Sequence, residues 1–115
     1  MRTSESKAVA PLHLTSENFS TIVGTGNLPV LVDFWAEWCP PCRALLPTID
    51  RLASETQGLA VIGKVNVDEA PEIARDYRVQ SIPTLIIFKN GREVDRMVGV
   101  YPRDEIARRL LNTRA

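Results

Sequence analysis

Two cysteines three residues apart are the part of this sequence best suited to chemistry. They are Cys39 and Cys42, in the segment Trp-Cys-Pro-Pro-Cys, and the chain has no others. Residues at this spacing near a helix start have Cβ atoms about 5–6 Å apart, and a disulfide accepts Cα atoms about 4.4–6.8 Å apart. The pair can therefore close and open a disulfide without a large backbone movement, which predicts redox chemistry.

The expected position of Cys39, between a strand and a helix, favours the reactive form of its thiol. A buried strand is expected over Pro29–Trp35, and a helix is expected to begin near Cys39–Pro41. Unpaired backbone N–H groups and the helix dipole at such a junction favour a thiolate over a thiol. Because the thiolate is the nucleophilic species, Cys39 has the setting of a reactive cysteine.

Three other uses of the cysteines fit the sequence less well. A zinc site normally needs four ligands, and the chain adds only one histidine, His13, so carboxylates would have to complete it. A cysteine–histidine nucleophile pair would need the same His13, at the far N-terminal edge. Two inert core cysteines would flank a Pro-Pro pair, which breaks a strand or the middle of a helix. We therefore favour redox use and expect no metal.

Asp33 is the second residue of chemical interest, because it is the one charge in an otherwise apolar strand. Burying a carboxylate without a partner is costly, and desolvation would raise its pKa. Lys64 interrupts the neighbouring strand and is the obvious electrostatic partner. A functional acid and a structural Asp33–Lys64 pair both stay open, because structural pairs also perturb pKa values.

Length and composition limit the class of protein. The chain has 115 residues, of which 44% are hydrophobic and 24% charged, as expected for one globular domain. Fourteen basic residues balance fourteen acidic ones, so no net charge draws the chain to nucleic acid or an anionic membrane. The longest apolar run, Leu85–Phe88, is too short to span a bilayer.

The N-terminal segment is polar, contains Glu5 and does not resemble a secretory signal. We interpret residues 1–11 as a mobile tail and residues 12–115 as the folded domain. Two cysteines are too few for a disulfide-stapled secreted scaffold. The expected location is therefore the cytoplasm.

The rest of the pattern predicts alternating strands and helices. Strands are expected over Leu12–Leu14, Pro29–Trp35, Ala60–Val67, Thr84–Phe88 and Glu93–Val98. Helices are expected after a cap at Thr15 or Ser16, from Cys39–Pro41 to Gly58, over Glu69–Tyr77 and from Pro102. The order βαβαβαββα predicts an α/β fold whose mixed central sheet has helices on both faces.

Local signals add three details to this order. Asn90–Gly91 predicts a hairpin, so the last two strands should be antiparallel neighbours. Pro47 lies inside the apolar stripe of the long helix and should kink it. Asp68 and Glu69 are expected at the start of the third helix, where they complement its dipole.

Nearly the whole chain, from about Leu12 onward, resembles the thioredoxin family. The matching pieces are VDFWAEWC (32–39), Cys42, Pro47, Lys64, VNVDE (65–69), SIPTLIIFKNG (81–91) and the Val98-Gly99 pair. The resemblance implies the thioredoxin fold, a five-stranded mixed sheet flanked by four helices, in agreement with the pattern. It also implies a protein-disulfide reductase, an electron carrier that serves cell redox homeostasis.

The resemblance implies a role for each candidate residue. Cys39 is implied to be the nucleophile that forms a mixed disulfide, and Cys42 the cysteine that resolves it. Asp33, with Lys64 as its partner, is implied to assist proton transfer at the resolving thiol. No cofactor is implied to be bound, and reducing equivalents would come from NADPH through a flavin-containing thioredoxin reductase. The partners would be that reductase and disulfide-containing proteins, with the chain itself a monomer.

The resemblance also implies a substrate-binding rim around Cys39. A cis proline, Pro83, would face the dithiol, and the backbone of Ile82 would bind an extended substrate segment through strand-like hydrogen bonds. The implied rim consists of Trp38, Pro40, Pro41, Ile82, Pro83, Val98 and Gly99.

Pro40 departs from the usual family motif Trp-Cys-Gly-Pro-Cys. Because a residue before proline is pushed away from helical angles, Pro40 is expected to delay or strain the helix start. A stiffer turn could also shift the reduction potential, in a direction that the sequence leaves open. Two rival functions stay open as well: a disulfide oxidant or isomerase, and a non-catalytic subunit that binds partners through the apolar rim.

Overall fold

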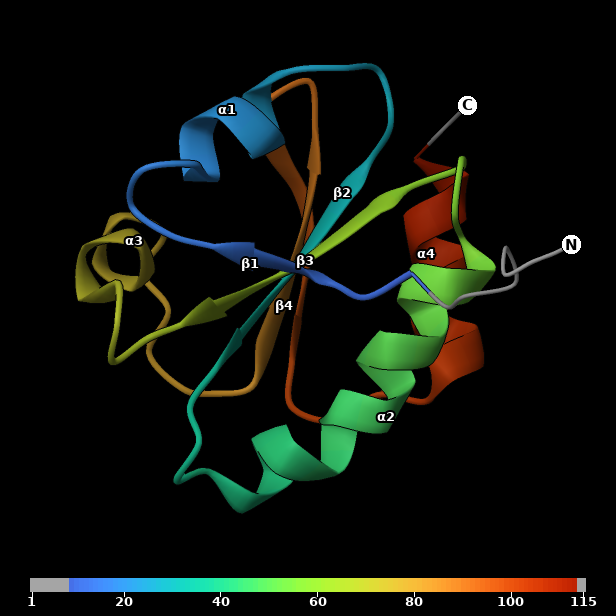
Figure 1. The fold of residues 1–115 in the computed structure, drawn as a ribbon. Coiled ribbons are helices and arrows are strands. Elements are labelled where there is room, and N and C mark those ends of the chain that lie inside the picture. The colour runs from blue at the N-terminus through green and yellow to red at the C-terminus, as the bar shows by residue number, and fades with distance from the viewer. Residues whose placement is uncertain (1–8, 114–115) are drawn as a thin grey trace, which may run out of the picture.

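The computed structural model describes residues 9–113, in which five strands and four helices follow the predicted order (Figure 1). The strands are β1 (Leu12–Leu14), β2 (Val30–Trp35), β3 (Val61–Asn66), β4 (Thr84–Lys89) and β5 (Arg92–Val98). The helices are α1 (Phe19–Gly24), α2 (Pro40–Glu55), α3 (Pro71–Asp76) and α4 (Arg103–Asn112).

The strands form one mixed sheet in the order β1-β3-β2-β4-β5. β2 lies at its centre, parallel to β3 and antiparallel to β4, and β4 and β5 form the predicted antiparallel hairpin. At the opposite edge, β1 is parallel to β3 and packs Leu14 against Gly63, where an added Cβ would lie 2.6 Å from a Leu14 methyl carbon. The apolar, β-branched composition of β2 fits a strand whose two faces are both covered.

Helices cover both faces of the sheet, as predicted. α1 and α3 lie on one side and α2 and α4 on the other (Figure 1). Because side chains alternate along a strand, Val32 and Phe34 enter the core beneath α1 and α3, whereas Leu31 packs with Leu45 and Ile49 of α2. Asp33 is therefore on the face of β2 that α2 covers.

Three predicted helix boundaries are wrong, and one of them is the start of α3, which lies at Pro71 rather than Glu69. α1 is not capped by Thr15 or Ser16; it begins at Phe19 with Asn18 as its N-cap residue. The Asn18 carboxamide instead accepts a hydrogen bond from the Thr15 amide at 2.7 Å, which closes a turn before the helix. α2 ends at Glu55 rather than Gly58, because residues 56–59 leave the helix as a turn.

The proline expectations for α2 have opposite outcomes. Pro40 does not delay the helix, which begins at Pro40 itself. Cys39, the N-cap residue before the prolines, is already extended (φ −99°, ψ 107°), and the first turn leaves its N–H groups unpaired in any case. Pro47 lies within a continuous helix whose two halves point in different directions in Figure 1, which agrees with the expected bend.

The expected tail falls mostly outside the described part of the chain. Residues 1–8 lie outside it, and residues 9–11 belong to no helix or strand. The assignment of residues 12–115 to one domain stays a prediction. Between residues 9 and 113, no helix combines the length and the apolar character needed to cross a membrane.

Candidate active site

Cys39 and Cys42 lie where β2 passes into α2, and they are joined in a disulfide with their Cα atoms 5.2 Å apart. Cys39 is the N-cap residue of α2, and the Cys42 amide donates a hydrogen bond to its sulfur at 3.3 Å. Since Pro40 and Pro41 have no N–H, this amide is the first donor of α2 that can reach the sulfur. The helix start is therefore arranged to stabilise negative charge on Cys39.

The two cysteines differ in how far a partner can reach them. Cys42 is completely buried, whereas Cys39 keeps 4% of its surface exposed and has the 64%-exposed Trp38 as its neighbour. The Cys39 sulfur lies 3.8 Å from the carbonyl oxygen of Ile82. A molecule approaching from solvent therefore meets Cys39 and the Ile82 backbone together.

The bond between Ile82 and Pro83 is cis and lies between α3 and β4. The Gly99 amide, directly after β5, donates to the Pro83 carbonyl oxygen at 2.8 Å. Val98 is more than half exposed and pairs with Thr84 at the end of the hairpin. The structure thus brings Ile82, Pro83, Val98 and Gly99, predicted as parts of one rim, to the same end of the sheet.

The Trp38 side chain is held by the carboxylate of Asp68, a residue that the sequence analysis placed at the start of the third helix. Its Nε1 donates to Oδ2 of Asp68 at 2.7 Å. Asp68 is not at the start of α3, which begins at Pro71; it lies in the preceding turn, where the Asn66 side chain accepts from the Asp68 amide at 2.9 Å. An Asn two residues before an Asp is a turn signal that could have placed Asp68 in a turn before the helix, although it does not identify Trp38 as its partner.

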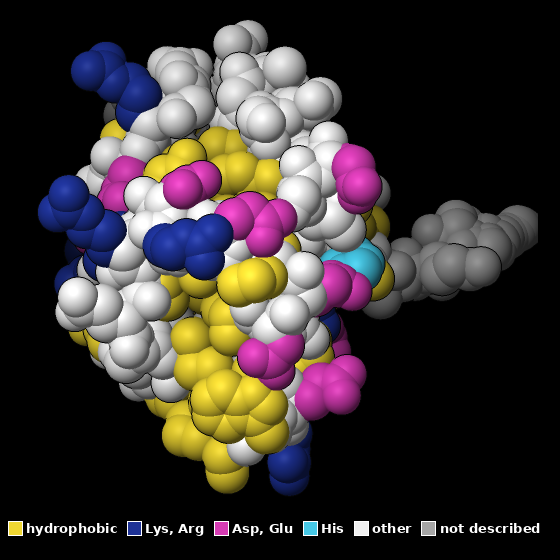
Figure 2. All heavy atoms as spheres, turned by 90° about the vertical axis from the view of Figure 1, so that its left-hand side faces the viewer, with side chains coloured by type: hydrophobic (Ala, Val, Ile, Leu, Met, Phe, Trp, Pro, Cys, Tyr) yellow, Lys and Arg dark blue, Asp and Glu magenta, His cyan; other side chains and the backbone are white. Residues whose placement is uncertain are grey.

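A surface hollow of about 190 Å³ lies beside the indole ring. It is lined by Trp38, Val67, Ala74, Val79, Gln80, Ser81 and Ile82. Figure 2 shows the face of the molecule that is on the left in Figure 1. Hydrophobic side chains gather there toward the end where α2 begins, and acidic side chains border them. The rim can therefore bury apolar groups of a partner next to Cys39.

Asp33 lies in the centre of β2 with no exposed surface, and neither carboxylate oxygen accepts a hydrogen bond from any described residue. Burial raises its pKa from 3.8 to about 7, and the nearby positive charge of Lys64 acts in the opposite direction. Lys64 is its register partner on β3, but the described residues contain no ion pair between them. The Lys64 Nζ lies over the Trp35 ring, 4.9 Å from its centre. The buried carboxyl can therefore gain or lose a proton near neutral pH.

His13 lies on β1, and its Nε2 contacts the carboxylate of Glu69. Between residues 9 and 113, no group of three or more His, Cys, Asp or Glu side chains is placed to hold a metal ion.

Comparison with known proteins agrees with this geometry. A sequence model described as Thioredoxin matches residues 10–112. The chain belongs to the thioredoxin family. It is 49% identical to a thioredoxin of Chlorobaculum thiosulfatiphilum over 96 residues, which cover 84% of this chain and 89% of that protein. It is 44% identical to thioredoxin 1 of a Nostoc species over 101 residues, which cover 88% and 94% of the two chains.

A solved structure supports the same family assignment. A mutant thioredoxin from Halobacterium salinarum superposes with a TM-score of 0.83 at 31% identity, covering all of this chain and 97% of the other. The thioredoxin fold predicted from the sequence is therefore confirmed. Relatives of this similarity, together with the Cys39–Cys42 pair, establish the chain as a thiol–disulfide oxidoreductase, a protein-disulfide reductase.

Proposed function

We propose that the protein reduces protein disulfides by a two-step exchange in which Cys39 attacks and Cys42 resolves. The observation that carries this order is the difference between the two sulfurs. Cys39 keeps 4% of its surface exposed, caps α2 and accepts a hydrogen bond from the Cys42 amide, whereas Cys42 is completely buried. An N-capping sulfur is stabilised as a thiolate, and a buried thiol is out of a substrate's reach.

The reaction balances as a two-electron transfer. The Cys39 thiolate attacks one sulfur of the substrate disulfide, forming a mixed disulfide and releasing a thiolate that takes up a proton. The Cys42 thiol loses its proton and attacks the Cys39 sulfur, which releases the second substrate thiolate, and this thiolate also takes up a proton. The substrate leaves with two thiols, and the protein is left with the Cys39–Cys42 disulfide.

Asp33 is the group we assign to accept the Cys42 proton. Its support is a pKa of about 7, close to the pH at which the thiol must be deprotonated. The carboxyl lies on the face of β2 that α2 covers, and α2 carries Cys42 in its first turn. Lys64 keeps this pKa from rising further, so we assign it a supporting role through Asp33.

Substrate binding is assigned to the rim around Cys39. The Ile82 carbonyl, 3.8 Å from the Cys39 sulfur, is placed to accept a hydrogen bond from an extended segment next to the substrate cysteine. Trp38, Val98 and the hollow beside Trp38 would bury apolar substrate groups. Pro40, Pro41, Pro83 and Gly99 complete the proposed rim.

For the cellular setting, we infer that NADPH supplies the electrons through a flavin-containing thioredoxin reductase. The protein would act as a monomer in the cytoplasm, on proteins whose disulfides reach the rim. Oxidation, isomerisation and partner binding without turnover are the rival functions.

The test is to trap the intermediate. Cys42→Ser should accumulate a mixed disulfide between Cys39 and a polypeptide substrate such as insulin, whereas Cys39→Ser should form none. Mass spectrometry of both variants after quenching measures this. A mixed disulfide on Cys42 in the Cys39→Ser variant would reverse the assigned order.

The reduction potential separates the rival functions. A value near about −270 mV fits a reductant, whereas a value near about −180 mV or above fits an isomerase or oxidant. A binding module would keep its biological activity in the Cys39→Ser, Cys42→Ser double variant, but a reductase would lose it.

A further inference from the structure

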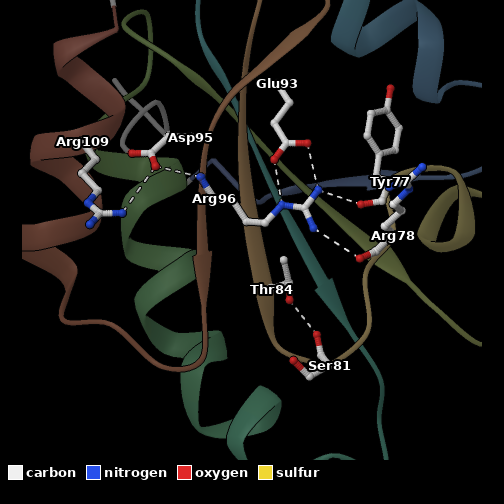
Figure 3. Close-up of polar contacts among 8 residues, drawn as sticks. All are labelled: Tyr77, Arg78, Ser81, Thr84, Glu93, Asp95, Arg96 and Arg109. Atoms are coloured by element: carbon white, nitrogen blue, oxygen red, sulfur yellow. Dashed lines mark hydrogen bonds and ion pairs between the residues drawn. The ribbon is translucent and has the colours of Figure 1, made fainter.

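The loop between α3 and β4 (residues 77–83) is held at its start by one arginine of the edge strand β5. Nη2 of Arg96 donates to the Tyr77 carbonyl oxygen at 2.7 Å, and Nη1 donates to the Arg78 carbonyl oxygen at 3.4 Å. Figure 3 shows the Arg96 guanidinium between these two carbonyls and the Glu93 carboxylate. One side chain thus bridges β5 and the end of α3.

Glu93 fixes the orientation of this guanidinium. Its two carboxylate oxygens accept from Nε of Arg96 at 2.7 Å and from Nη2 at 2.8 Å. A bidentate, charge-assisted pair of this kind sets the plane of the guanidinium. The donors that face the loop are therefore aimed before any substrate arrives.

The loop begins in a conformation that needs such support. Arg78 has a φ of 56°, in the left-handed region that side chains with a Cβ rarely adopt. The amides of Arg78 and Val79 donate back to carbonyls of α3, that of Val79 to Ala74 at 2.9 Å. Arg96 holds the carbonyls on either side of the turn and so fixes the direction in which the loop leaves α3.

The far end of the loop is held by the residue that follows β5 and by the first residue of β4. The Gly99 amide, one residue past β5, bonds the Pro83 carbonyl at 2.8 Å, and the Thr84 hydroxyl donates to the Ser81 carbonyl at 2.6 Å. Ile82, whose carbonyl faces the Cys39 sulfur, lies between these anchors. Its position therefore depends on both ends of the loop.

We propose that Arg96 is a positioning residue for disulfide exchange with polypeptide substrates, acting through its clamp on the loop of residues 77–83. This inference rests on the proposed function, in which the Ile82 backbone binds the substrate beside Cys39. A polypeptide disulfide must meet Ile82 and Cys39 in one geometry, but a small disulfide needs only Cys39. Loosening the loop therefore slows the first reaction and spares the second.

Arg96→Met and the matched control Arg109→Met test this selectivity. Arg109 is about as exposed as Arg96 and is also paired with acidic side chains, those of Asp95 and Glu105, but it lies on α4 and has no contact with the loop (Figure 3). Arg96→Met should lower kcat/KM for insulin reduction about tenfold, mainly through KM. It should leave the rate with 5,5′-dithiobis(2-nitrobenzoate) within about twofold, and Arg109→Met should leave both within about twofold. An unchanged ratio of the two rates in Arg96→Met overturns the proposal.

Hydrogen exchange gives a second measurement that does not depend on turnover. The Val79 amide should exchange about tenfold faster in Arg96→Met, after correction for global stability, and at the native rate in Arg109→Met. Native exchange of Val79 in Arg96→Met would show that no clamp exists. Failure of the unmodified protein to reduce insulin would instead refute the proposed function, and Val79 exchange would still decide whether Arg96 holds the loop.

Discussion

The central strand β2 and the edge strand β5 both carry ionisable side chains, in opposite environments. β2 holds one, Asp33, which is fully buried and accepts no hydrogen bond from any described residue. β5 holds four, and its two carboxylates, Glu93 and Asp95, are paired with Arg96 and Arg109. The unpaired charge is the one whose pKa moves toward neutrality.

This difference shows how ionisable side chains in one sheet can serve two purposes, proton exchange and the positioning of neighbouring groups. Desolvation without a partner makes Asp33 a group that exchanges a proton near neutral pH. Pairing on β5 keeps the charges fixed, and hydrogen bonding to Glu93 holds the pKa of Arg96 above its usual value. A side chain whose charge is fixed by pairing can position neighbouring groups, whereas a carboxyl group whose pKa lies near neutral pH can transfer protons.

The largest expected effect comes from removing the unpaired charge. Because folding raises the Asp33 pKa to about 7, the folded state binds the proton more tightly than the unfolded state, and stability falls as pH rises from about 4 to about 8. Three pKa units correspond to roughly 4 kcal/mol. Asp33→Asn should abolish this decline in the free energy of unfolding, measured by urea denaturation across that pH range. Parallel profiles for the two proteins would place the Asp33 pKa near its ordinary value.

The same variant should slow turnover at neutral pH. With no carboxylate to accept the Cys42 proton, resolution of the mixed disulfide should fall by about 10²-fold or more. Rapid-quench measurement of mixed-disulfide decay checks this, with the formation step as the internal control. A native resolution rate would remove Asp33 from the mechanism and leave it a structural carboxyl.

Lys64→Met sharpens the comparison by removing the one nearby charge that lowers the Asp33 pKa. The folded-state pKa should rise further, so the decline in stability should still begin near pH 4 but extend to a higher pH. Lys89→Met is the matched control, because Lys89 bonds the Asn27 carbonyl at the end of β4. NMR titration of the Asp33 carboxyl measures both, and equal shifts in the two variants would exclude a specific Lys64 effect.

The smallest effect is expected on the side of β5 that faces α4. Arg109 pairs with Asp95 at 3.5 Å and with Glu105 at 3.0 Å, and because both pairs are partly exposed, Arg109→Met should cost about 1 kcal/mol or less. That loss should shrink further in high salt, as measured by thermal unfolding. If the free energy of unfolding fell by several kcal/mol, the paired charges of β5 would matter as much for stability as the buried Asp33, and the contrast between the two strands would be wrong.

Most of the fold could be predicted because its signals are local. The Asn90–Gly91 pair predicted the hairpin, and the apolar run of β2 predicted a central strand. Helix ends were less predictable, since several residues compete to cap them. Asn18 rather than Thr15 precedes α1 because its carboxamide closes a turn with the Thr15 amide.

The site divides in the same way. Cys39 and Asp33 differ in residue type from the rest of their own segments, so they could be predicted as site residues from the sequence. The contacts of Asp68 with Trp38 and of Arg96 with Tyr77 join residues 30 and 19 positions apart. Such contacts depend on the register of the sheet and on where α3 begins, and no local pattern contains either.

The proline pair between the two cysteines also has a spectroscopic consequence. Proline has no amide proton, so Pro40 and Pro41 give no peak in a ¹H–¹⁵N correlation spectrum. The next amide along the chain, that of Cys42, lies 3.3 Å from the Cys39 sulfur. That single resonance reports whether the sulfur is thiol, thiolate or disulfide, and its shift during a redox titration follows the equilibrium of the dithiol without any added label.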